Sequence, residues 1–481
     1  MKPTVQQEAF LSAMEGSSNI ALSAVAGSGK TTTLTLGSQA LSASGRHLAV
    51  AFNKRIVEDM VKKFPSTIVC KTMNALGHQS WGKQLGKRLT LNTEKIPVLI
   101  KAEIPDFNSR MRTPKLEAVI RSARLNNLDP QSEQEEWEEI LEGVDPDTDE
   151  GPLYISRARK ILEISNNDAY RGTIDFTDQL YCPVQFDGPF EKYDTVLVDE
   201  SQDLSPLQHA MISRCIKDRV IIAGDPRQAI YGFAGAMPGS MESFQRRFGM
   251  EELPLTWSFR CPKAIVREAQ HFNPVIESAP WAVEGEVTRR GFEAIQRGDV
   301  VISYRNSKLI SAAFAIIRSG IGAKMVGAGD LASQLVKLAG KFPFESTSKY
   351  IERVQAWKER EMSMLLAAKK KGPAERLAER AECLIQIVLG SEAKSIPEIE
   401  LRIRDIFDMD GKDSNVLCST IHKAKGLEWP RVHFLHLSDL FRGRDLSEAE
   451  REQRRNMAYV GITRSQQYLN FIQEKSDGET Q

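Results

Sequence analysis

The chain lacks the features that mark membrane and secreted proteins. None of its apolar runs approaches the ~18 residues that a membrane-spanning helix needs. The first ten residues, MKPTVQQEAF, contain no apolar segment of the kind found in signal peptides. We therefore expect an intracellular, cytoplasmic protein with no membrane partner.

Cysteine and net charge are also scarce. The 481 residues include six cysteines, and no two of them have C-x-x-C spacing, which argues against a zinc cluster and a disulfide framework. Lys plus Arg and Asp plus Glu each number 64, so the chain carries no overall basic footprint for nucleic acid. Any nucleic-acid binding must therefore depend on local groups of residues.

The apolar runs that are present predict a parallel α/β architecture. At about 150 residues per domain, the length suggests roughly three units. Strand-like runs alternate with helical stretches, as in parallel sheets. They fall at 19–25, 47–52, 67–70, 194–198 and 219–223, and again at 298–305, 323–328, 415–421 and 431–437. The pattern favours two α/β domains.

Two long polar segments interrupt these domains. One includes an acidic stretch and the other is rich in Lys, Arg, Glu and Ala, and both are typical of solvated helices. The predicted organisation is a first split domain (1–82 and 173–280) with a helical insertion (83–172), and a second split domain (281–330 and 412–481) with a small helical insertion (331–411).

Residues 19–33, NIALSAVAGSGKTTT, carry the strongest chemical signal. An apolar strand leads into a glycine-rich loop and a Lys-Thr pair. Backbone N–H groups of residues 27–29 can bind an anion at a helix N-terminus, with Lys30 on the outer phosphates and Thr31 on Mg²⁺. The usual pattern opens with glycine six residues before the lysine, where this chain has Ala24. The segment predicts a nucleoside triphosphate site but does not indicate what hydrolysis drives.

In a second motif, VLVDESQDLSP at 196–206, an apolar run ends in two consecutive carboxylates. In a nucleotide hydrolase, Asp199 would hold Mg²⁺, directly or through water, and Glu200 would deprotonate the attacking water. The segment at 220–236 has the same strand-then-acid form. It supplies Gln228, whose amide can sense the γ-phosphate or position water.

Taken in order, these motifs resemble those of superfamily 1 DNA helicases of the UvrD/Rep/PcrA group, and the core is similar to that of F-box DNA helicases. The resemblance spans nearly the whole chain, and the leading alanine of AVAGSGKT is a form that this family itself uses. It also rests on the segments TVQQEAF, LAVAFNK, CKTMNALG, IDFTDQL, WSFRCP, ISYRNS, STIHKAKGLEW and RRNMAYVGITRS. Their joint order makes it specific. It implies two RecA-like P-loop NTPase domains, each with a mainly helical insertion.

The resemblance implies a role for several residues at the nucleotide. Arg260 and Arg464 would stabilise charge on the γ-phosphate, while Phe259 would stack on the adenine and Gln6 would read it. The predicted catalytic residues are Lys30, Glu200, Gln228, Arg260 and Arg464. The predicted nucleotide-binding residues are Gln6, Ala26, Gly27, Ser28, Gly29, Lys30, Thr31, Thr32, Phe259 and Glu428, and the predicted metal ligands are Thr31 and Asp199. The implied cofactors are ATP and Mg²⁺.

A track for single-stranded DNA is implied as well. Single strands are bound by aromatic stacking along a positively lined groove. The predicted contacts are Phe52, Asn53, Thr72, Phe233, Arg305, Asn306, His422 and Lys423. Two positions depart from the family pattern: Asn74 replaces the usual histidine, and Ala234 replaces an arginine. That arginine typically links the nucleotide site to the DNA site, so its replacement bears on how tightly the two are coupled.

Three functions are compatible with these motifs. The first, which we prefer, is an ATP-dependent helicase or translocase on single-stranded DNA and its junctions with duplex, in repair, recombination or replication. The resemblance alone implies 3′→5′ polarity. The second is a translocase that strips proteins such as recombinase filaments from DNA, and the third is a regulatory ATPase subunit of a nuclease complex. We expect DNA repair or recombination proteins as partners, a monomer, and a bacterial or phage source.

Overall fold

The computed structural model contains two compact units, described in turn below. It describes residues 2–51, 54–107, 112–144, 150–232, 235–237, 239–326, 329–367, 371–407, 415–442 and 446–472. Unit 1 comprises Met1–Ala24 and Gly29–Leu255, and unit 2 comprises Val25–Ser28 and Thr256–Gln481. The units divide after Leu255, and the four-segment organisation expected from the sequence, with its boundary after residue 280, stays a prediction.

Unit 1 is built around a six-stranded sheet in which every neighbouring pair is parallel. In spatial order its strands are β3 (Ile68–Thr72), β2 (His47–Ala51), β6 (Tyr193–Val198), β7 (Ile216–Gly224), β1 (Ile20–Ala24) and β8 (Glu251–Leu255). The five strand-like runs predicted in this half are confirmed. The sequence analysis missed β8, because EELPL is polar and lies at the sheet edge, where it pairs with β1 alone.

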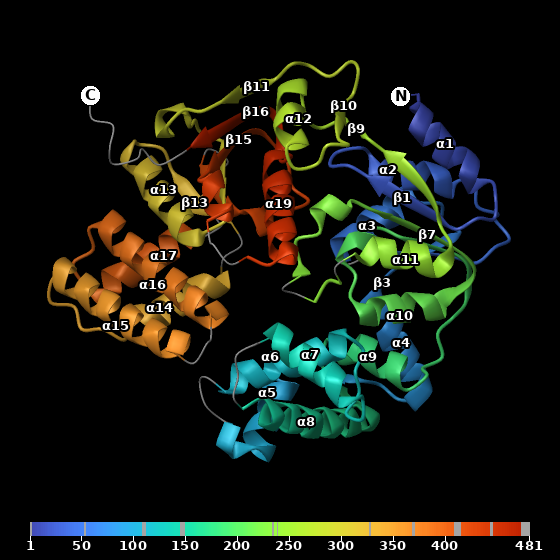
Figure 1. Cartoon of the computed structure of the whole chain (residues 1–481), viewed down its shortest axis with the longest axis horizontal. Helices are drawn as coiled ribbons and strands as arrows, with labels where there is room; N and C mark the ends of the chain where they lie inside the picture. The colour runs from blue at the N-terminus through green and yellow to red at the C-terminus, as the bar shows by residue number, and fades with distance from the viewer. Residues whose placement is uncertain are drawn as a thin grey trace. The chain divides into compact units, whose positions relative to one another are not determined.

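Helices cover both faces of this sheet (Figure 1). Successive residues of a strand point to opposite faces, so Leu48 and Val50 of β2 enter one core and Ala49 and Ala51 enter the other. The first face is covered by α4 (Met73–Leu85), α9 (Asp178–Gln185), α10 (Pro206–Cys215) and α11 (Ser240–Phe248), and the second by α1 (Val5–Met14), α2 (Lys30–Ser38) and α3 (Lys54–Lys63). Burial on both faces explains why the central strands are nearly continuous apolar runs.

A helical module interrupts unit 1 between the short paired strands β4 (Thr90–Leu91) and β5 (Thr173–Ile174). It contains α5 (Lys95–Glu103), α6 (Arg112–Leu125), α7 (Gln134–Val144) and α8 (Gly151–Arg171), with the single turn η1 (Pro105–Phe107). Trp137 and Ile161 of this module belong to the same core cluster as Leu48 of the sheet. The module shares a core with the first face of the sheet, and its predicted status as a separate insertion at 83–172 stays a prediction.

Four buried charges join this module to the start of α9 and the residues just before it. Lys95 Nζ lies 2.7 Å from Asp178 Oδ2 and donates to the carbonyl oxygen of Ser165 at 2.7 Å. Arg124 Nη1 lies 2.8 Å from Asp175 Oδ2 and 3.0 Å from Asp178 Oδ1. Because buried charges need partners, these pairs fix α5 and α6 against the IDFTDQL segment.

Unit 2 contains a second six-stranded sheet, also parallel throughout. In spatial order its strands are β11 (Glu286–Thr288), β16 (Ser465–Ile472), β15 (Trp429–Leu435), β12 (Val300–Ser303), β14 (Val416–Thr420) and β13 (Ala323–Met325). The four runs predicted here are confirmed as β12 to β15, except that residues 327–328 lie outside the described residues. Two strands were not predicted from the sequence: β11, which is three residues long, and β16, which begins with the polar sequence SQQ.

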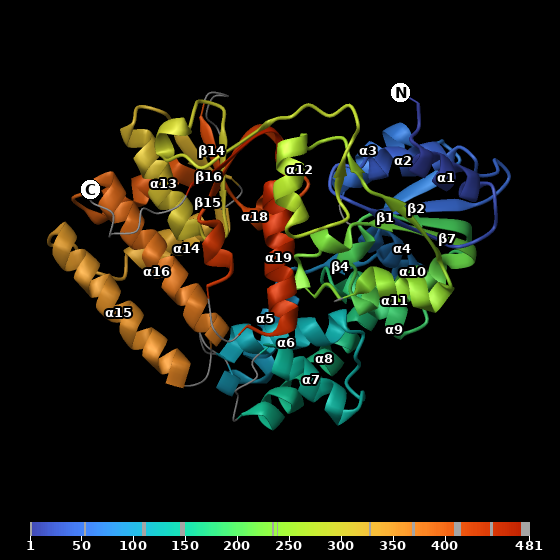
Figure 2. The ribbon, with the colours of Figure 1, turned by 45° about the horizontal axis from the view of Figure 1, so that its top comes forward.

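Helices of unit 2 complete the α/β pattern. A group of four, α14 (Gly329–Ala339), α15 (Thr347–Ala367), α16 (Lys371–Ser391) and α17 (Ile396–Phe407), packs with α13 (Asn306–Arg318) on one core (Figure 2). The other helices are α12 (Lys263–Gln270), α18 (Ile421–Ala424) and α19 (Glu448–Ile462), with the single turns η5 (Phe292–Ala294) and η6 (Leu437–Leu440). Two further strands, β9 (Trp257–Ser258) and β10 (Glu277–Ser278), pair with each other.

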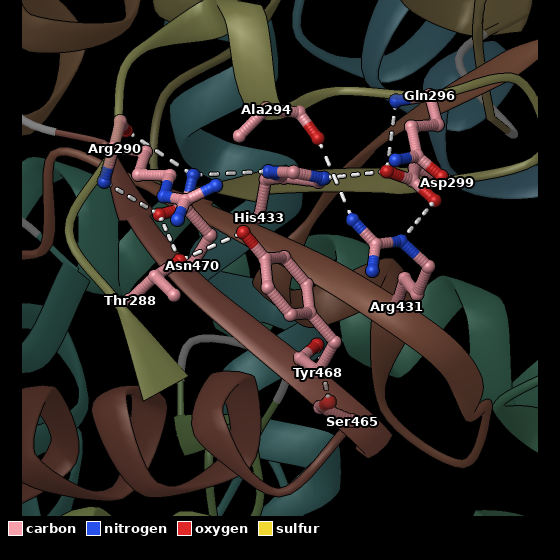
Figure 3. Close-up of polar contacts among 10 residues, drawn as sticks. All are labelled: Thr288, Arg290, Ala294, Gln296, Asp299, Arg431, His433, Ser465, Tyr468 and Asn470. Atoms are coloured by element: carbon pink, nitrogen blue, oxygen red, sulfur yellow. Dashed lines mark hydrogen bonds and ion pairs between the residues drawn. The ribbon is translucent and has the colours of Figure 1, made fainter. Parts of the chain in front are cut away.

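A buried polar network links neighbouring strands in one half of the unit 2 sheet (Figure 3). His433 Nε2 lies 2.7 Å from Asp299 Oδ2, and Asn470 Nδ2 lies 3.2 Å from His433 Nδ1. Asn470 is oriented by the backbone of Arg290, whose N–H donates to Oδ1 at 2.8 Å and whose carbonyl accepts from Nδ2 at 3.1 Å. The amide therefore donates to Nδ1, which leaves the ring proton on Nε2. The network links β15 and β16 to the residues that precede β12 and follow β11.

The structure also bears on the cysteines and on membrane-spanning helices. All six cysteines lie among the described residues and are free thiols. Of the helices in the described part of the chain, none is both long and apolar enough to cross a membrane.

Candidate active site

The carboxyl ends of three adjacent strands of unit 1 carry the predicted nucleotide-site residues. The order β6-β7-β1 places the loops after these strands at one edge of the sheet, where α/β proteins bind ligands. The loop after β1 leads to Lys30, the first residue of α2. Gly27 and Gly29 have φ of 73° and 76°, left-handed values that glycine adopts without steric cost. Such a loop can direct backbone N–H groups toward an anion.

Lys30 lies between the two predicted acids. Its Nζ is 3.0 Å from Asp199 Oδ1 and 2.8 Å from Glu200 Oε1. Burial alone would lower the pKa of the Lys30 ammonium, but the charges and hydrogen bonds of Asp199 and Glu200 outweigh burial and hold this pKa above its ordinary value. The three residues, which the sequence singled out in two separate motifs, therefore form one charged cluster.

Thr31 and Asp199 fit the role of Mg²⁺ ligands. Thr31 Oγ1 donates to Asp199 Oδ2 at 3.1 Å, so a hydroxyl and a carboxylate, both oxygen donors that Mg²⁺ prefers, lie together beside the loop. The described residues include no group of three or more His, Cys, Asp or Glu side chains that could hold a metal ion. A magnesium ion bound through few protein ligands typically completes its coordination with phosphate and water.

Glu200 is held in an unusual backbone conformation. Its φ of 56° and ψ of 38° are left-handed, a region that costs a non-glycine residue energy and that is enriched at functional sites. It stands between β6 and the single turn η2 (Ser201–Asp203), and its N–H donates to Asp199 Oδ1 at 2.9 Å. The conformation turns two consecutive carboxylates toward the same lysine.

Gln202 and Asp225 are functional candidates that sequence reasoning missed. Gln202 Nε2 donates to Glu200 Oε2 at 2.6 Å, and its Oε1 accepts the N–H of Asp225 at 3.2 Å. Asp225 Oδ2 in turn accepts from Gln228 Nε2 at 2.7 Å, beside the turn η3 (Pro226–Gln228). Both residues lie inside the quoted motifs. Only their hydrogen bonds identify them as the groups that orient Glu200 and Gln228.

The remaining unit 1 candidates are on or beside α1 and α2. Gln6, the predicted adenine reader, is half-buried in the first turn of α1, and Thr32 is exposed on α2. The neighbouring Gln7 is buried and completes the capping box of α1 with Thr4. Its Nε2 also donates to Thr33 Oγ1 at 3.0 Å, so Gln7 connects the two helices.

Two predicted arginines belong to unit 2. Arg260 pairs through Nε with Glu428 and donates from Nη1 to the carbonyl oxygen of Thr463 at 3.3 Å. Glu428 also accepts from Gln466 Nε2 at 3.0 Å. Arg260 and Glu428, which the analysis assigned to the nucleotide, therefore contact each other.

Arg464 is buried, with 1% of its surface exposed. Its guanidinium donates to the carbonyl oxygens of Val460 at 2.7 Å and Leu427 at 3.2 Å, and to Thr463 Oγ1 at 3.0 Å. These bonds hold the end of α19 against the residues that precede β15.

The beginning of the phosphate loop, residues 25–28, is grouped with unit 2. The N–H of Ala26 donates to the hydroxyl of Tyr459 on α19 at 2.9 Å, and the carbonyl oxygen of Gly27 accepts the N–H of Phe259 at 2.8 Å. Ser28 is buried. Phe259, the predicted adenine platform, is thus hydrogen-bonded through its backbone to the loop.

Of the DNA contacts predicted in unit 1, Thr72 lies among the described residues, at the end of β3. Thr72 caps α4, its Oγ1 accepting from the N–H of Ala75 at 3.1 Å. Asn74 Nδ2 donates to the carbonyl oxygen of Phe176 at 3.0 Å, and the Phe176 side chain is 57% exposed. Phe176 is an aromatic candidate that the analysis quoted within a motif but did not select. Phe52, Asn53, Phe233 and Ala234 lie outside the described residues.

Four DNA candidates of unit 2 follow adjacent strands of its sheet. Arg305 and Asn306 follow β12, and His422 and Lys423 follow β14. The side chains of Arg305 and Lys423 are exposed, while His422 is half-buried. Burial lowers the pKa of the His422 imidazole to about 4, so this ring is neutral at physiological pH.

Sequence comparisons agree with this arrangement. Residues 4–249 match the UvrD/REP helicase N-terminal domain, and residues 333–476 match the UvrD-like helicase C-terminal domain. A solved arterivirus helicase, nonstructural protein 10, aligns over 98% of this chain and 62% of its own with a TM-score of 0.36 at 13% identity. That TM-score is too low to carry an argument.

Two curated relatives align over most of the chain. F-box DNA helicase protein 1 of Schizosaccharomyces pombe is 23% identical over 93% of this chain and 54% of its own length. ATP-dependent DNA helicase UvrD2 of Mycobacterium tuberculosis is 24% identical over 92% of this chain and 75% of its own. The chain thus spans about half of the first relative and three quarters of the second. With both domain models matched in order, the chain belongs to the UvrD/REP helicase family.

Proposed function

We propose that this chain is an ATP-dependent DNA helicase that moves 3′→5′ along single-stranded DNA. The observation that carries the proposal is the contact of Lys30 with Asp199 and Glu200, beside a loop that contains two left-handed glycines. That arrangement supports nucleotide hydrolysis, and family membership supports DNA as the substrate.

The unit 1 residues divide the chemistry of hydrolysis among them. Lys30 is cationic at neutral pH and binds the outer phosphates. Glu200 accepts the proton of the attacking water, with Gln202 fixing the direction of its carboxylate. Gln228, held by Asp225, orients that water. Thr31 and Asp199 hold Mg²⁺, which when bound neutralises charge on the phosphate oxygens.

Three residues of unit 2 also have a proposed role at the nucleotide. Arg260 and Arg464 act on the charge that develops at the γ-phosphate, and Phe259 stacks on the adenine. The resemblance assigns these roles, and the cationic guanidinium groups suit the first of them.

DNA is the proposed partner of residues at the carboxyl ends of strands in both sheets. Arg305 and Lys423 supply exposed cations for phosphates. Thr72 and Asn306 supply polar contacts at strand ends. Proteins of DNA repair or recombination are the proposed further partners.

Steady-state ATPase assays of the purified chain test the proposal. We expect single-stranded DNA to raise turnover, and we expect Glu200→Gln to lower the stimulated kcat by roughly 10²- to 10⁴-fold, the range for loss of a general base. Glu163→Gln, an exposed carboxylate on α8, is the matched control and should retain full activity. Persistence of stimulated turnover in Glu200→Gln would show that the base assignment is wrong.

Tailed duplexes test the direction and the work done. The chain should displace a strand from a duplex with a 3′ single-stranded tail and not from one with a 5′ tail. Opening of the 5′-tailed duplex alone would refute the polarity. If neither duplex opens but a bound recombinase filament is cleared from single-stranded DNA, the chain is a protein-stripping translocase.

A further inference from the structure

Three aromatic side chains of unit 2 form a continuous row. Trp257 begins β9, Phe259 follows it by two residues, and Trp281 lies three residues after β10. The rings of Phe259 and Trp281 are stacked, with centroids 6.2 Å apart and planes at 20°. Trp257 meets Trp281 edge to face, at 5.9 Å and 88°. Both arrangements lie in the range where aromatic rings attract each other.

The row is exposed, which is unusual for side chains of this size. Trp281 is 61% exposed and Phe259 is 37% exposed. Tryptophan and phenylalanine contribute most to stability when they are buried, so core packing does not account for this pair. Flat, accessible rings are suited to stacking on the base of a nucleotide.

One end of the row is anchored to the phosphate loop. Besides the hydrogen bond from Phe259 N–H to Gly27, the loop approaches the next residue closely: a Cβ atom placed on Gly27 would lie 2.4 Å from Arg260 Cβ. Only glycine permits this approach. The backbone that carries the Phe259 ring is therefore fixed against the loop proposed to hold the phosphates.

The other end is anchored by the β9–β10 pair. Trp257 is the ladder partner of Glu277, and its indole Nε1 donates to Glu277 Oε2 at 3.1 Å. Trp257 is thus fixed by its backbone and by its indole. Because the two indoles are in contact edge to face, Trp257 restricts the orientation of Trp281 in turn.

We propose that Trp281 is a positioning residue for the nucleobase. It stacks on one face of Phe259 and holds that ring in the orientation that receives the purine of the bound triphosphate. The inference rests on the proposed function and deepens it, because it makes the orientation of Phe259, and through it the affinity for the base, depend on a tryptophan that lies outside the recognised helicase motifs.

ATPase kinetics with and without a base test this role. Trp281→Ala leaves the Phe259 ring in place but removes the side chain that orients it, so the KM for ATP should rise by about five- to tenfold, the weaker end of the range for one base–aromatic stack, with kcat within about twofold of the unchanged chain. Inorganic tripolyphosphate, a competitor that has no base, should inhibit both proteins equally. Trp281→Phe should restore the KM, and Val283→Ala, an equally exposed apolar site two residues away, should leave it unchanged.

Three outcomes would overturn the inference. An unchanged KM for ATP in Trp281→Ala would show that the tryptophan does not support base binding. An equal loss of affinity for ATP and tripolyphosphate would show that the substitution disturbs the phosphate site instead. Weaker binding of single-stranded DNA with an unchanged KM would assign the row to a DNA base. The first two outcomes compare basal ATPase parameters and the third is an equilibrium binding measurement, so all three are separate from the question of whether DNA stimulates turnover or is unwound.

Discussion

The ammonium of Lys30 lies 2.8 Å from the carboxylate of Glu200, so the proposed phosphate ligand and the proposed base form one ion pair. Asp199 completes the cluster at 3.0 Å. The contact joins the first turn of α2 to the end of β6, segments about 170 residues apart in the chain. The same lysine therefore orients the acids and offers the cation that binds phosphate.

Replacing Lys30 tests this dual role. Lys30→Ala should lower ATP turnover by at least ~100-fold, as expected when a charge-stabilising group is removed from a phosphate site, and should weaken nucleotide binding. The measurements are kcat/KM for ATP and equilibrium binding of a fluorescent ATP analogue. Lys62→Ala, an exposed lysine on α3, is the control and should match the unchanged chain. Normal turnover by Lys30→Ala would remove this site from the mechanism.

Replacing Gln202 should lower the rate of ATP hydrolysis and leave nucleotide binding nearly unchanged. Its amide donates to Glu200 and accepts from the backbone of Asp225, so Gln202→Ala frees the proposed base to adopt unproductive orientations. We expect kcat to fall by about 10- to 100-fold, as for other residues that orient a reacting group, with KM for ATP within about threefold. A rise in KM with normal kcat would instead place Gln202 in nucleotide binding.

The sequence predicted the framework well because the framework depends on regular patterns. Nine apolar runs correspond to parallel strands, and burial on both faces makes the central ones easy to recognise. The edge strands β8 and β11 escaped because β8 is polar and β11 is three residues long. The interior strand β16 escaped because it begins with the polar sequence SQQ. Prediction thus followed apolar sequence, whatever the position of the strand in the sheet.

The residues proposed to contact the nucleotide and Mg²⁺ were predictable from the sequence. The residues that orient them were not. Lys30, Asp199 and Glu200 stand at strand ends within recognisable motifs, and the structure brings them together. The role of Gln202 depends on the direction of its hydrogen bonds with Glu200 and Asp225, and the role of Trp281 depends on the geometry of its ring against Phe259. Neither property leaves a periodic or local pattern in a single sequence.

The buried charges between the helical module and the IDFTDQL segment should be costly to break. Asp178→Asn leaves Lys95 and Arg124 short of a countercharge in the interior, so we expect the free energy of unfolding to fall by about 3–5 kcal/mol. Urea unfolding followed by circular dichroism measures this loss. Asp168→Asn, which removes an exposed helix pair with Arg171, should cause little change. Equal stability of both variants would show that the buried charges are not coupled to folding.

His209 should make the stability of unit 1 depend on pH. The ring is buried, and its Nε2 lies 2.7 Å from Ser240 Oγ. Ser240 Oγ donates to the carbonyl oxygen of Ser201 at 2.7 Å, so it accepts from the imidazole, which therefore carries its proton on Nε2. Burial, with a smaller contribution from Arg247, lowers the pKa of His209 to about 4 from an ordinary value of 6.5.

The sign of the effect follows from this depressed pKa. Between pH 6.5 and about 4 the unfolded chain binds a proton at His209 that the folded chain does not, so stability is present above this window and is lost as the pH falls through it. The contribution is at most about 1.4 kcal/mol per pH unit. His209→Gln should therefore lose less stability than the unchanged chain when urea unfolding is compared at pH 7.5, 6.0 and 5.0. Ser240→Ala removes the hydrogen-bond partner but keeps the imidazole, so it should retain the pH dependence. Parallel pH profiles for His209→Gln and the unchanged chain would show that this ring is not coupled to folding.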